Sequence, residues 1–360
     1  MNFDLSEEQE MFVTSATRFA APVDVEVRRR LRLSPAGYDR ARWLQLAELG
    51  LIALAAGETA GGMGGSAVDL ALVAEALGKA NAPDPWLEHG ILPALLLERG
   101  GAASELAAVL SGETIATLAW TERGQRYSLT PKAMKAEQGA DSVTLTGEKT
   151  MVMGAALADL FIVTADGGGE TGCFLVPRDA PGLEVRPYRL ADGSIAGEVK
   201  LTRTPAAARL ALDAAALDDV VADMRLYAAA EMVGLGQRLL DDTLAYVKER
   251  EQFGVAIGSF QALQHRLVDC YAREEQARSM LYRAALTDRS ESAKWQRAAA
   301  GAKAFIGENV DAIAREAVQM HGGMGITDEL AIGHALKRVL VLARLFGDVD
   351  TVLAEYALAA

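Results

Sequence analysis

The chain has 360 residues, of which 51% are hydrophobic, so it can bury a large core and hold two or three domains. Its formal net charge of -13 and its pI near 4.9 argue against unspecific binding to nucleic acid or to anionic lipid. The acidic first residues do not resemble a secretory or transit peptide, and no charge-free apolar run reaches bilayer length. We therefore expect a soluble cytoplasmic protein without a nucleic-acid or membrane partner.

The sequence gives no indication of metal or disulfide chemistry. Cys173 and Cys270 lie far apart in unlike contexts, which suggests neither a disulfide framework nor a thiolate metal site. The four histidines lack the close spacing that metal ligands usually show. We expect no metal, and a reducing compartment fits best.

Residues 1–113 are predicted to form an N-terminal helical domain. Ser6-Glu-Glu-Gln9 is typical of a capping box, and the apolar residues after it recur at helical spacing. The glycine cluster at 61–65 interrupts this pattern. A glycine cluster can cradle a phosphate, but this one has no following lysine or strand–helix context, which favours a plain loop.

The helical spacing of apolar residues is lost in residues 114–208, which are predicted to form a small β domain. Short runs rich in β-branched residues alternate there with Gly and Pro. Residues 209–360 return to long helical patterns, with two glycine-bearing joints. The predicted fold class is therefore α+β: an N-terminal helical domain, a middle β domain and a C-terminal helical bundle.

The first joint follows a helix predicted for residues 227–248. The helix delivers Arg250 to a turn at Phe253 and Gly254, so a positive charge and backbone donors come together, as a pyrophosphate requires. Taken alone, this pattern is more typical of a helical hairpin with a solvated arginine.

The second joint closes a helix predicted for residues 295–320. Gly322 and Gly323 permit positive φ and a close approach of the backbone to a ligand, although a glycine pair can also be a simple helix stop. His321 sits between a methionine and these glycines, where a local hydrogen bond is a better interpretation than catalysis.

Together the two joints resemble the flavin-binding signature of the acyl-CoA dehydrogenase family. Gln261 follows Arg250 by eleven residues, and the run from Gln319 through Gly322 and Gly323 to Thr327 repeats a family motif. Further family segments follow in order over nearly the whole chain. The resemblance implies the cofactor FAD, and it carries over as FAD contacts the residues Arg250, Phe253, Gln261, Gln319, Gly322 and Gly323.

The resemblance also implies partners. In the family one motif contacts the flavin of a neighbouring subunit, so at least a dimer and usually a tetramer is expected. The segments 229–234 and 345–348 resemble the small subunits of heteromeric enzymes, such as the pimeloyl-CoA dehydrogenase small subunit. Implied partners are an acyl-CoA substrate, a homologous subunit in a heterotetramer or a second copy of the chain, and electron-transfer flavoprotein as electron acceptor.

The catalytic base of the family is missing. Alignment on Lys337-Arg338 places Gly347 where the usual glutamate stands, and Met224 occupies the alternative glutamate position on an earlier helix. Asp348 and Glu231 are the two possible substitutes. Each also has a structural interpretation, Asp348 as a turn cap and Glu231 as a member of a buried pair.

Other departures affect the residues that face the flavin ring in the family. Thr121-Glu122 continues as Arg-Gly, the expected Trp/Tyr-Ile-Thr is Met-Val-Met at 151–153, and Val349 replaces a threonine. The main hypothesis is a FAD-dependent acyl-CoA dehydrogenase-type subunit that lacks the base and acts in a heteromer. Two alternatives remain: a self-sufficient flavin enzyme that uses Asp348 or Glu231 to oxidise a nitroalkane or amine, and a flavin-free scaffold.

Overall fold

The computed structural model describes residues 4–21, 25–35, 37–139 and 142–358. Helices come first, then a sheet, then helices again, which confirms the predicted α+β class. By packing, the chain forms two compact units. The helical unit gathers residues 1–30, 67–83 and 222–360, and the sheet unit gathers residues 31–66 and 84–221. The domain limits at residues 113 and 208 stay a prediction, because these units describe packing only.

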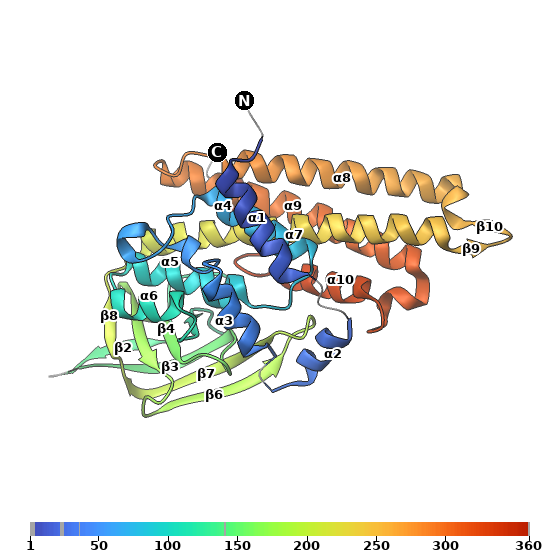
Figure 1. Ribbon diagram of the computed structural model, residues 1–360. Coiled ribbons are helices and arrows are strands. Elements are labelled where there is room, and N and C mark those ends of the chain that lie inside the picture. The colour runs from blue at the N-terminus through green and yellow to red at the C-terminus, as the bar shows by residue number, and fades with distance from the viewer. Residues whose placement is uncertain (1–3, 22–24, 36, 140–141, 359–360) are drawn as a thin grey trace. The chain divides into compact units, whose positions relative to one another are not determined.

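Long helices make up the helical unit, in which α9 packs along α8 and also contacts α10 and α11 (Figure 1). Two short strands and two 3-10 helices connect them. The helices are α1 Glu7–Ala20, α2 Val25–Leu33 (whose last residues belong to the sheet unit), α4 Ala67–Lys79, α7 Ala214–Glu249 (whose first residues belong to the sheet unit), α8 Gln261–Ala285, α9 Ser292–His321, α10 Ala331–Leu342 and α11 Val349–Leu358. The connecting elements are β9 Glu251–Gln252, β10 Val255–Ala256, η4 Ile257–Ser259 and η5 Gly322–Ile326.

Local sequence explains how this unit begins and how two of its helices cross. The predicted capping box is confirmed, because Ser6 and Gln9 exchange side-chain and backbone hydrogen bonds at the start of α1. A Cβ atom at Gly234 of α7 would lie 2.0 Å from the carbonyl oxygen of Glu75 of α4. Glycine is therefore required for the two backbones to touch, and this contact fixes the part of α7 that carries Glu231.

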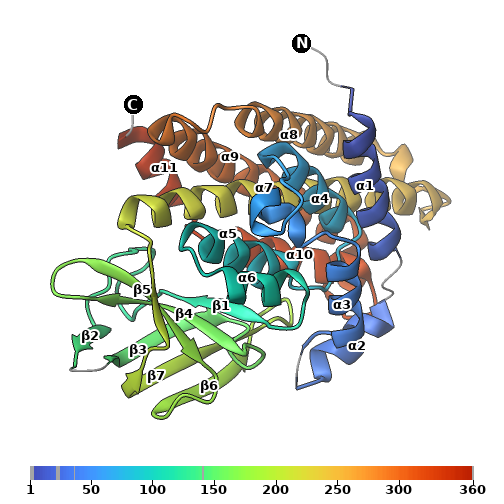
Figure 2. The same cartoon turned by 60° about the vertical axis from the view of Figure 1, so that its left-hand side comes forward.

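The sheet unit combines an eight-stranded sheet with short helices, and α5 packs against β1 (Figure 2). The strands run in the order β6-β7-β3-β2-β4-β5-β8, with β1 paired to β4. Only the pairs of β4 with β1 and with β2 are parallel among the described strands. The strands are β1 Ala116–Ala119, β2 Lys135–Gln138, β3 Val143–Met153, β4 Leu160–Asp166, β5 Thr171–Pro177, β6 Leu183–Arg189, β7 Ile195–Pro205 and β8 Ala208–Leu210.

The helical elements of this unit are short, and its apolar core lies on the sheet, with side chains such as Leu145, Phe161 and Val199. A Cβ atom at Gly62 would lie 2.0 Å from the carbonyl oxygen of Ala56, so the glycine cluster serves a tight loop. The helical elements are α3 Arg40–Glu48, η1 Ala53–Ala55, η2 Glu58–Ala60, the π-helix η3 Trp86–Ile91, α5 Leu92–Arg99 and α6 Ala103–Leu110.

Candidate functional site

The first bend lies where α7 ends. Arg250, the next residue, donates its backbone N–H to the carbonyl of Tyr246, and the β9–β10 hairpin follows. Phe253 and Gly254 form the two-residue hairpin loop, with φ angles of +56° and +80°. Two positive φ angles suit glycine, so Phe253 adopts this loop at a cost of about 1–2 kcal/mol. The Phe253 side chain is 94% exposed, so the strained loop presents an aromatic ring to solvent.

The second bend lies where α9 ends. Gly322 has a φ of +61°, and a Cβ atom added to Gly322 or Gly323 would meet no atom within 4 Å. Gly325 differs, because a Cβ atom there would lie 2.7 Å from the carbonyl oxygen of Val318. The first two glycines therefore leave an open backbone surface, and the third is required for packing.

The two bends lie at the same end of the helical unit. The rings of Tyr246, one turn before Arg250, and His321, the last residue of α9, stack with their centroids 4.2 Å apart. His321 is buried, and its Nδ1 lies 2.8 Å from the carbonyl oxygen of Ala317. This histidine therefore holds the ends of two helices together, which agrees with the local role predicted for it.

Three polar side chains near the bends are exposed and have no protein partner in the described part of the chain. They are Arg250, Gln261 and Gln319. No hydrogen bond or ion pair to a described residue engages these side chains, whereas other charged side chains of the helical unit form ion pairs. An uncommitted guanidinium beside exposed backbone is the arrangement that binds a phosphate or diphosphate.

Gly347 lies in a buried turn between α10 and α11, and this turn has no room for a longer side chain. Its φ is +123°, and Phe346 before it also has a positive φ of +61°. A Cβ atom at Gly347 would lie 2.6 Å from Cγ1 of Val352 and 3.5 Å from the guanidinium of Arg225. A carboxylate at position 347 would therefore need a different backbone and a rearranged neighbour.

Two buried cations hold this turn. Arg225 of α7 donates from Nε to the carbonyl of Phe346 at 2.8 Å and pairs through both terminal nitrogens with Glu355 of α11. Lys303 of α9, only 1% exposed, donates from Nζ to the carbonyl of Gly347 at 3.2 Å. Burial and, to a smaller extent, the nearby Arg225 lower the pKa of Lys303 to about 7, although Asp348 acts in the opposite direction. The turn is therefore fixed by interactions of its backbone.

Both substitute carboxylates are engaged. Asp348 accepts a hydrogen bond at 2.9 Å from the backbone N–H of Thr351, in the first turn of α11. Glu231 forms a two-bond ion pair with Arg338 of α10, at 2.6 and 3.0 Å, and both side chains are largely buried. These contacts match the structural interpretations of the two residues. Arg338 engages both carboxylate oxygens of Glu231, which is the geometry of a structural ion pair.

In the sheet unit, Glu122 has a structural environment. Its carboxylate accepts backbone N–H bonds from residues 132–134 and a bond at 2.9 Å from the buried Lys149. Despite burial, which raises the pKa, the backbone N–H bonds and Lys149 together lower the pKa of Glu122 to about 2. This pair anchors the loop after β1. We infer no catalytic role for it.

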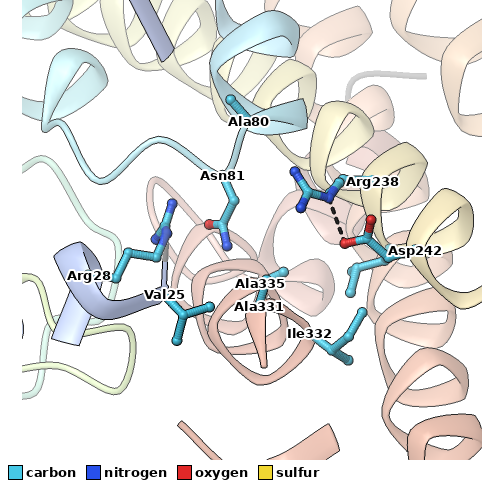
Figure 3. A pocket seen from close by; sticks show the side chains of 10 residues that line it. Val25, Arg28, Ala80, Asn81, Arg238, Asp242, Ala331, Ile332 and Ala335 are labelled. Carbon is cyan, nitrogen blue, oxygen red and sulfur yellow. Dashed lines mark hydrogen bonds and ion pairs between the residues drawn. The ribbon is translucent and has the colours of Figure 1, made fainter. Parts of the chain in front are cut away.

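A small cavity of about 30 Å³ lies elsewhere in the helical unit (Figure 3). Asn81, Arg28 and the first turn of α10 are among its lining residues. Asn81 is 5% exposed, and neither atom of its amide has a protein partner among the described residues.

In the described part of the chain, no helix is long and apolar enough to cross a bilayer, and no group of three acidic, His or Cys side chains could bind a metal.

Sequence reasoning missed Arg225, Lys303 and Lys149. A signal existed for the first two, because each is a lone cation in a helical stretch of almost continuous apolar residues, 220–235 and 299–306. A charge in such a stretch must be buried and paired. The sequence could not identify the partners of Arg225 and Lys303, since only the fold brings the carbonyl groups of residues 346 and 347 next to these two cations.

Domain families cover almost the whole chain. Residues 6–110, 117–203 and 214–354 match the N-terminal, middle and C-terminal domains of acyl-CoA dehydrogenase, in this order. The chain belongs to the acyl-CoA dehydrogenase family. It is therefore an oxidoreductase that uses FAD.

Relatives of this acyl-CoA dehydrogenase match it over nearly its full length. The chain is 34% identical to acyl-CoA dehydrogenase IpdE2 of Mycolicibacterium smegmatis, over 95% of this chain and 96% of the relative. It resembles a chain of the ChsE4-ChsE5 complex from Mycobacterium tuberculosis with a TM-score of 0.89 and 27% identity, covering 99% and 98%. It also resembles PigA with FAD and proline, with a TM-score of 0.90 and 27% identity, covering 99% and 98%.

Proposed function

We propose that this acyl-CoA dehydrogenase is the base-lacking subunit of a heteromeric enzyme that desaturates an acyl-CoA thioester between its α and β carbons. The single observation that carries the proposal is the turn at Gly347, where a φ of +123° and the contact with Val352 leave no room for a glutamate. A homologous partner subunit would then supply the base. One of the similar structures is itself a complex of two named proteins, ChsE4 and ChsE5.

The residues of the two bends fit the diphosphate of FAD. Arg250 would contribute charge, Gln261 and Gln319 would donate hydrogen bonds, Gly322 and Gly323 would let the phosphate approach the backbone, and Phe253 would cover it. All of them face solvent in this chain, which supports a role toward a flavin bound mainly by a neighbouring subunit. FAD, when bound, supplies the acceptor for the hydride that leaves the β carbon.

The turn at 346–348 can still serve the substrate. The backbone N–H of Gly347 makes no hydrogen bond to any described residue, while Arg225 and Lys303 bind the two carbonyl groups beside it. A buried, oriented N–H donor can polarise a thioester carbonyl without any side chain at position 347. We therefore assign orientation of the acyl thioester to this turn, and proton abstraction to the partner subunit.

Purification from the native host tests the proposal. We expect the chain to co-purify with a second acyl-CoA dehydrogenase chain, with about one FAD for each pair of chains. The pair should oxidise an acyl-CoA and reduce electron-transfer flavoprotein, while the isolated chain should not. Turnover by the isolated chain would overturn the proposal, and an absence of flavin from the complex would favour the scaffold alternative.

Two variants test the self-sufficient alternative. Asp348→Asn keeps an acceptor for the N–H of Thr351, so the complex should retain most of its activity. Glu231→Gln breaks the ion pair with Arg338, so its activity must be compared at equal folded fraction. If a properly folded Asp348→Asn or Glu231→Gln complex lost its activity, and a higher pH did not restore that activity, the base would be assigned to this chain.

A further inference from the structure

An apolar groove lies between α1 and α4 in the helical unit, and no residue of its described lining belongs to the two bends or to the turn at 346–348. Its volume is about 770 Å³, and Val13 of α1 and Leu72 and Ala76 of α4 are typical of its lining. The groove adjoins the small cavity beside Asn81, because the two share lining residues. The shared residues are Val25, Ala80, Arg238 and Ala331. The groove and the cavity together therefore offer a ligand an apolar part and a polar end.

Two charged side chains of the groove have partners within the chain. Glu75 pairs with Arg278 of α8. Lys79 pairs with Asp241 of α7 at 3.6 Å. The groove therefore presents mainly alkyl and methyl surface, and an apolar hollow of this size is typical of a site that binds a small molecule.

The polar end has hydrogen-bond donors without acceptors in the described part of the chain. Asn81 is only 5% exposed, neither atom of its amide has a described partner, and Figure 3 shows this amide pointing toward the first turn of α10. The N-cap residue of α10 is Leu330, whose side chain cannot cap the helix. The N–H groups of Ala331 and Ile332 donate to no described residue. An uncapped helix start beside a buried amide favours an acceptor that carries negative charge.

The charges around the cavity also favour an anion. Arg28 and Arg238 line the cavity, and Asp242 is the one acidic residue in its described lining. Arg238 binds Asp242 through Nε at 2.6 Å, so these two charges offset each other and Arg28 adds one excess positive charge. The cavity, at about 30 Å³, has room for one water-sized group. It can therefore take one oxygen of a carboxylate, whereas a phosphate group is too large.

We propose that the cavity and the groove bind an unbranched fatty acid, whose carboxylate takes the polar end and whose alkyl chain lies along α1 and α4. Asn81 and the first N–H groups of α10 donate to the carboxylate, and Arg28 supplies the opposite charge. In the absence of the acid, the same place has room for one water molecule. An acyl-CoA carries no charge on its thioester carbonyl, so the site selects the free acid. The site involves neither flavin nor the turn at 346–348, and it is independent of the proposed function.

Calorimetric titration of the full chain with decanoate tests this inference, and 1-decanol is the uncharged probe of similar shape. We expect saturable binding of about one decanoate per chain, without FAD or a partner subunit. Because charge-assisted hydrogen bonds are lost, 1-decanol should bind about 10- to 100-fold more weakly. Equal binding of the acid and the alcohol, or no saturable binding of decanoate, would overturn the proposal.

Variants test the two ends of the site separately. Asn81→Asp keeps the size of the side chain but places a second carboxylate at the polar end, so decanoate should bind at least about tenfold more weakly. Thr17→Trp places an indole at the exposed lining of the groove and should also weaken binding. Thr14→Trp is the matched control, because Thr14 is exposed on the same helix and outside the described lining. Unchanged affinity in Asn81→Asp or in Thr17→Trp, or equal losses in the two threonine variants, would overturn the proposed site.

Discussion

The turn at 346–348 and the two bends around Arg250 and Gly322 belong to the same helical unit, yet they differ in how their polar groups are used. In the turn, two buried cations bind the carbonyl groups, Asp348 caps α11, and Val352 fills the space beside Gly347. In the bends, the glycines face open space and Arg250 has no described partner. The carbonyl groups of the turn are satisfied within the chain and the N–H of Gly347 stays available for a substrate, whereas the bends await a ligand or subunit.

This difference indicates that the turn has lost the role of carrying the catalytic carboxylate, while the bends have kept a role in binding a ligand. A region that has merely lost a side chain should leave a gap, since protein interiors tolerate few voids. At Gly347 the neighbours close on the backbone, so the absence of a carboxylate is built into the packing. The bends show the reverse, because the loop is strained and its aromatic ring stays 94% exposed, with only an edge contact to Phe260 at 6.3 Å among the described rings.

Gly347→Glu, which restores the family residue, tests whether the turn at 346–348 has room for a carboxylate. We expect a loss of about 2–5 kcal/mol of folding free energy, from the positive φ and from the overlap with Val352. Denaturant unfolding measures this loss, and the double variant with Val352→Ala should recover the part due to overlap. A Gly347→Glu protein of unchanged stability that turns over acyl-CoA unaided would show that the site is not closed.

The bends are tested by Arg250→Ala. Loss of a charge-assisted hydrogen bond is worth about 1.5–3 kcal/mol, so FAD should bind the complex about 10- to 100-fold more weakly. Stability of the isolated chain should change by less than about 0.5 kcal/mol, because the side chain has no described protein partner. Lys248→Ala, which removes another exposed cation two residues earlier, should leave FAD affinity unchanged. Equal losses in both variants would point to unspecific electrostatics.

Lys303 makes the closed turn sensitive to pH. Burial lowers its pKa from 10.5 to about 7 in the folded protein, so between pH 7 and 10.5 the unfolded chain binds one more proton than the folded chain. Stability should therefore rise with pH across this window, by up to about 1.4 kcal/mol per unit. Lys303→Met should remove this slope in unfolding experiments at several pH values. A slope that survives in Lys303→Met must come from another group.

The order of helices, sheet and helices could be predicted from the spacing of apolar residues and from β-branched runs separated by Gly and Pro. The bends could be predicted from glycines and one arginine at the ends of predicted helices. These signals are local, so a sequence carries them directly. The partners of Glu231 and Lys303 could not be predicted in the same way. Arg338 lies 107 positions from Glu231, and Lys303 binds a carbonyl group, which every residue has. Only the path of the backbone selects such partners.

A smaller test concerns the Asn81 cavity, where a buried amide has no protein partner among the described residues, in contrast to the two carbonyl groups of the turn (Figure 3). The amide presents both a donor and an acceptor, and a cavity of about 30 Å³ has room for one water molecule, which can satisfy both. A high-resolution crystal structure should contain that water. Asn81 has a φ of +50°, so Asn81→Gly removes the amide without backbone strain.

The expected loss in Asn81→Gly is below about 1 kcal/mol, because the hydrogen bonds and the cost of burying the amide disappear together. Asn81→Asp is the informative control, since it tolerates the same backbone but offers only acceptors, and thus needs a donor such as Arg28 of the same cavity. A dry cavity, or a loss of several kcal/mol in Asn81→Gly, would mean that the amide is satisfied in another way. The bends, and not the Asn81 cavity, would then be the region that obtains its polar partners from another molecule.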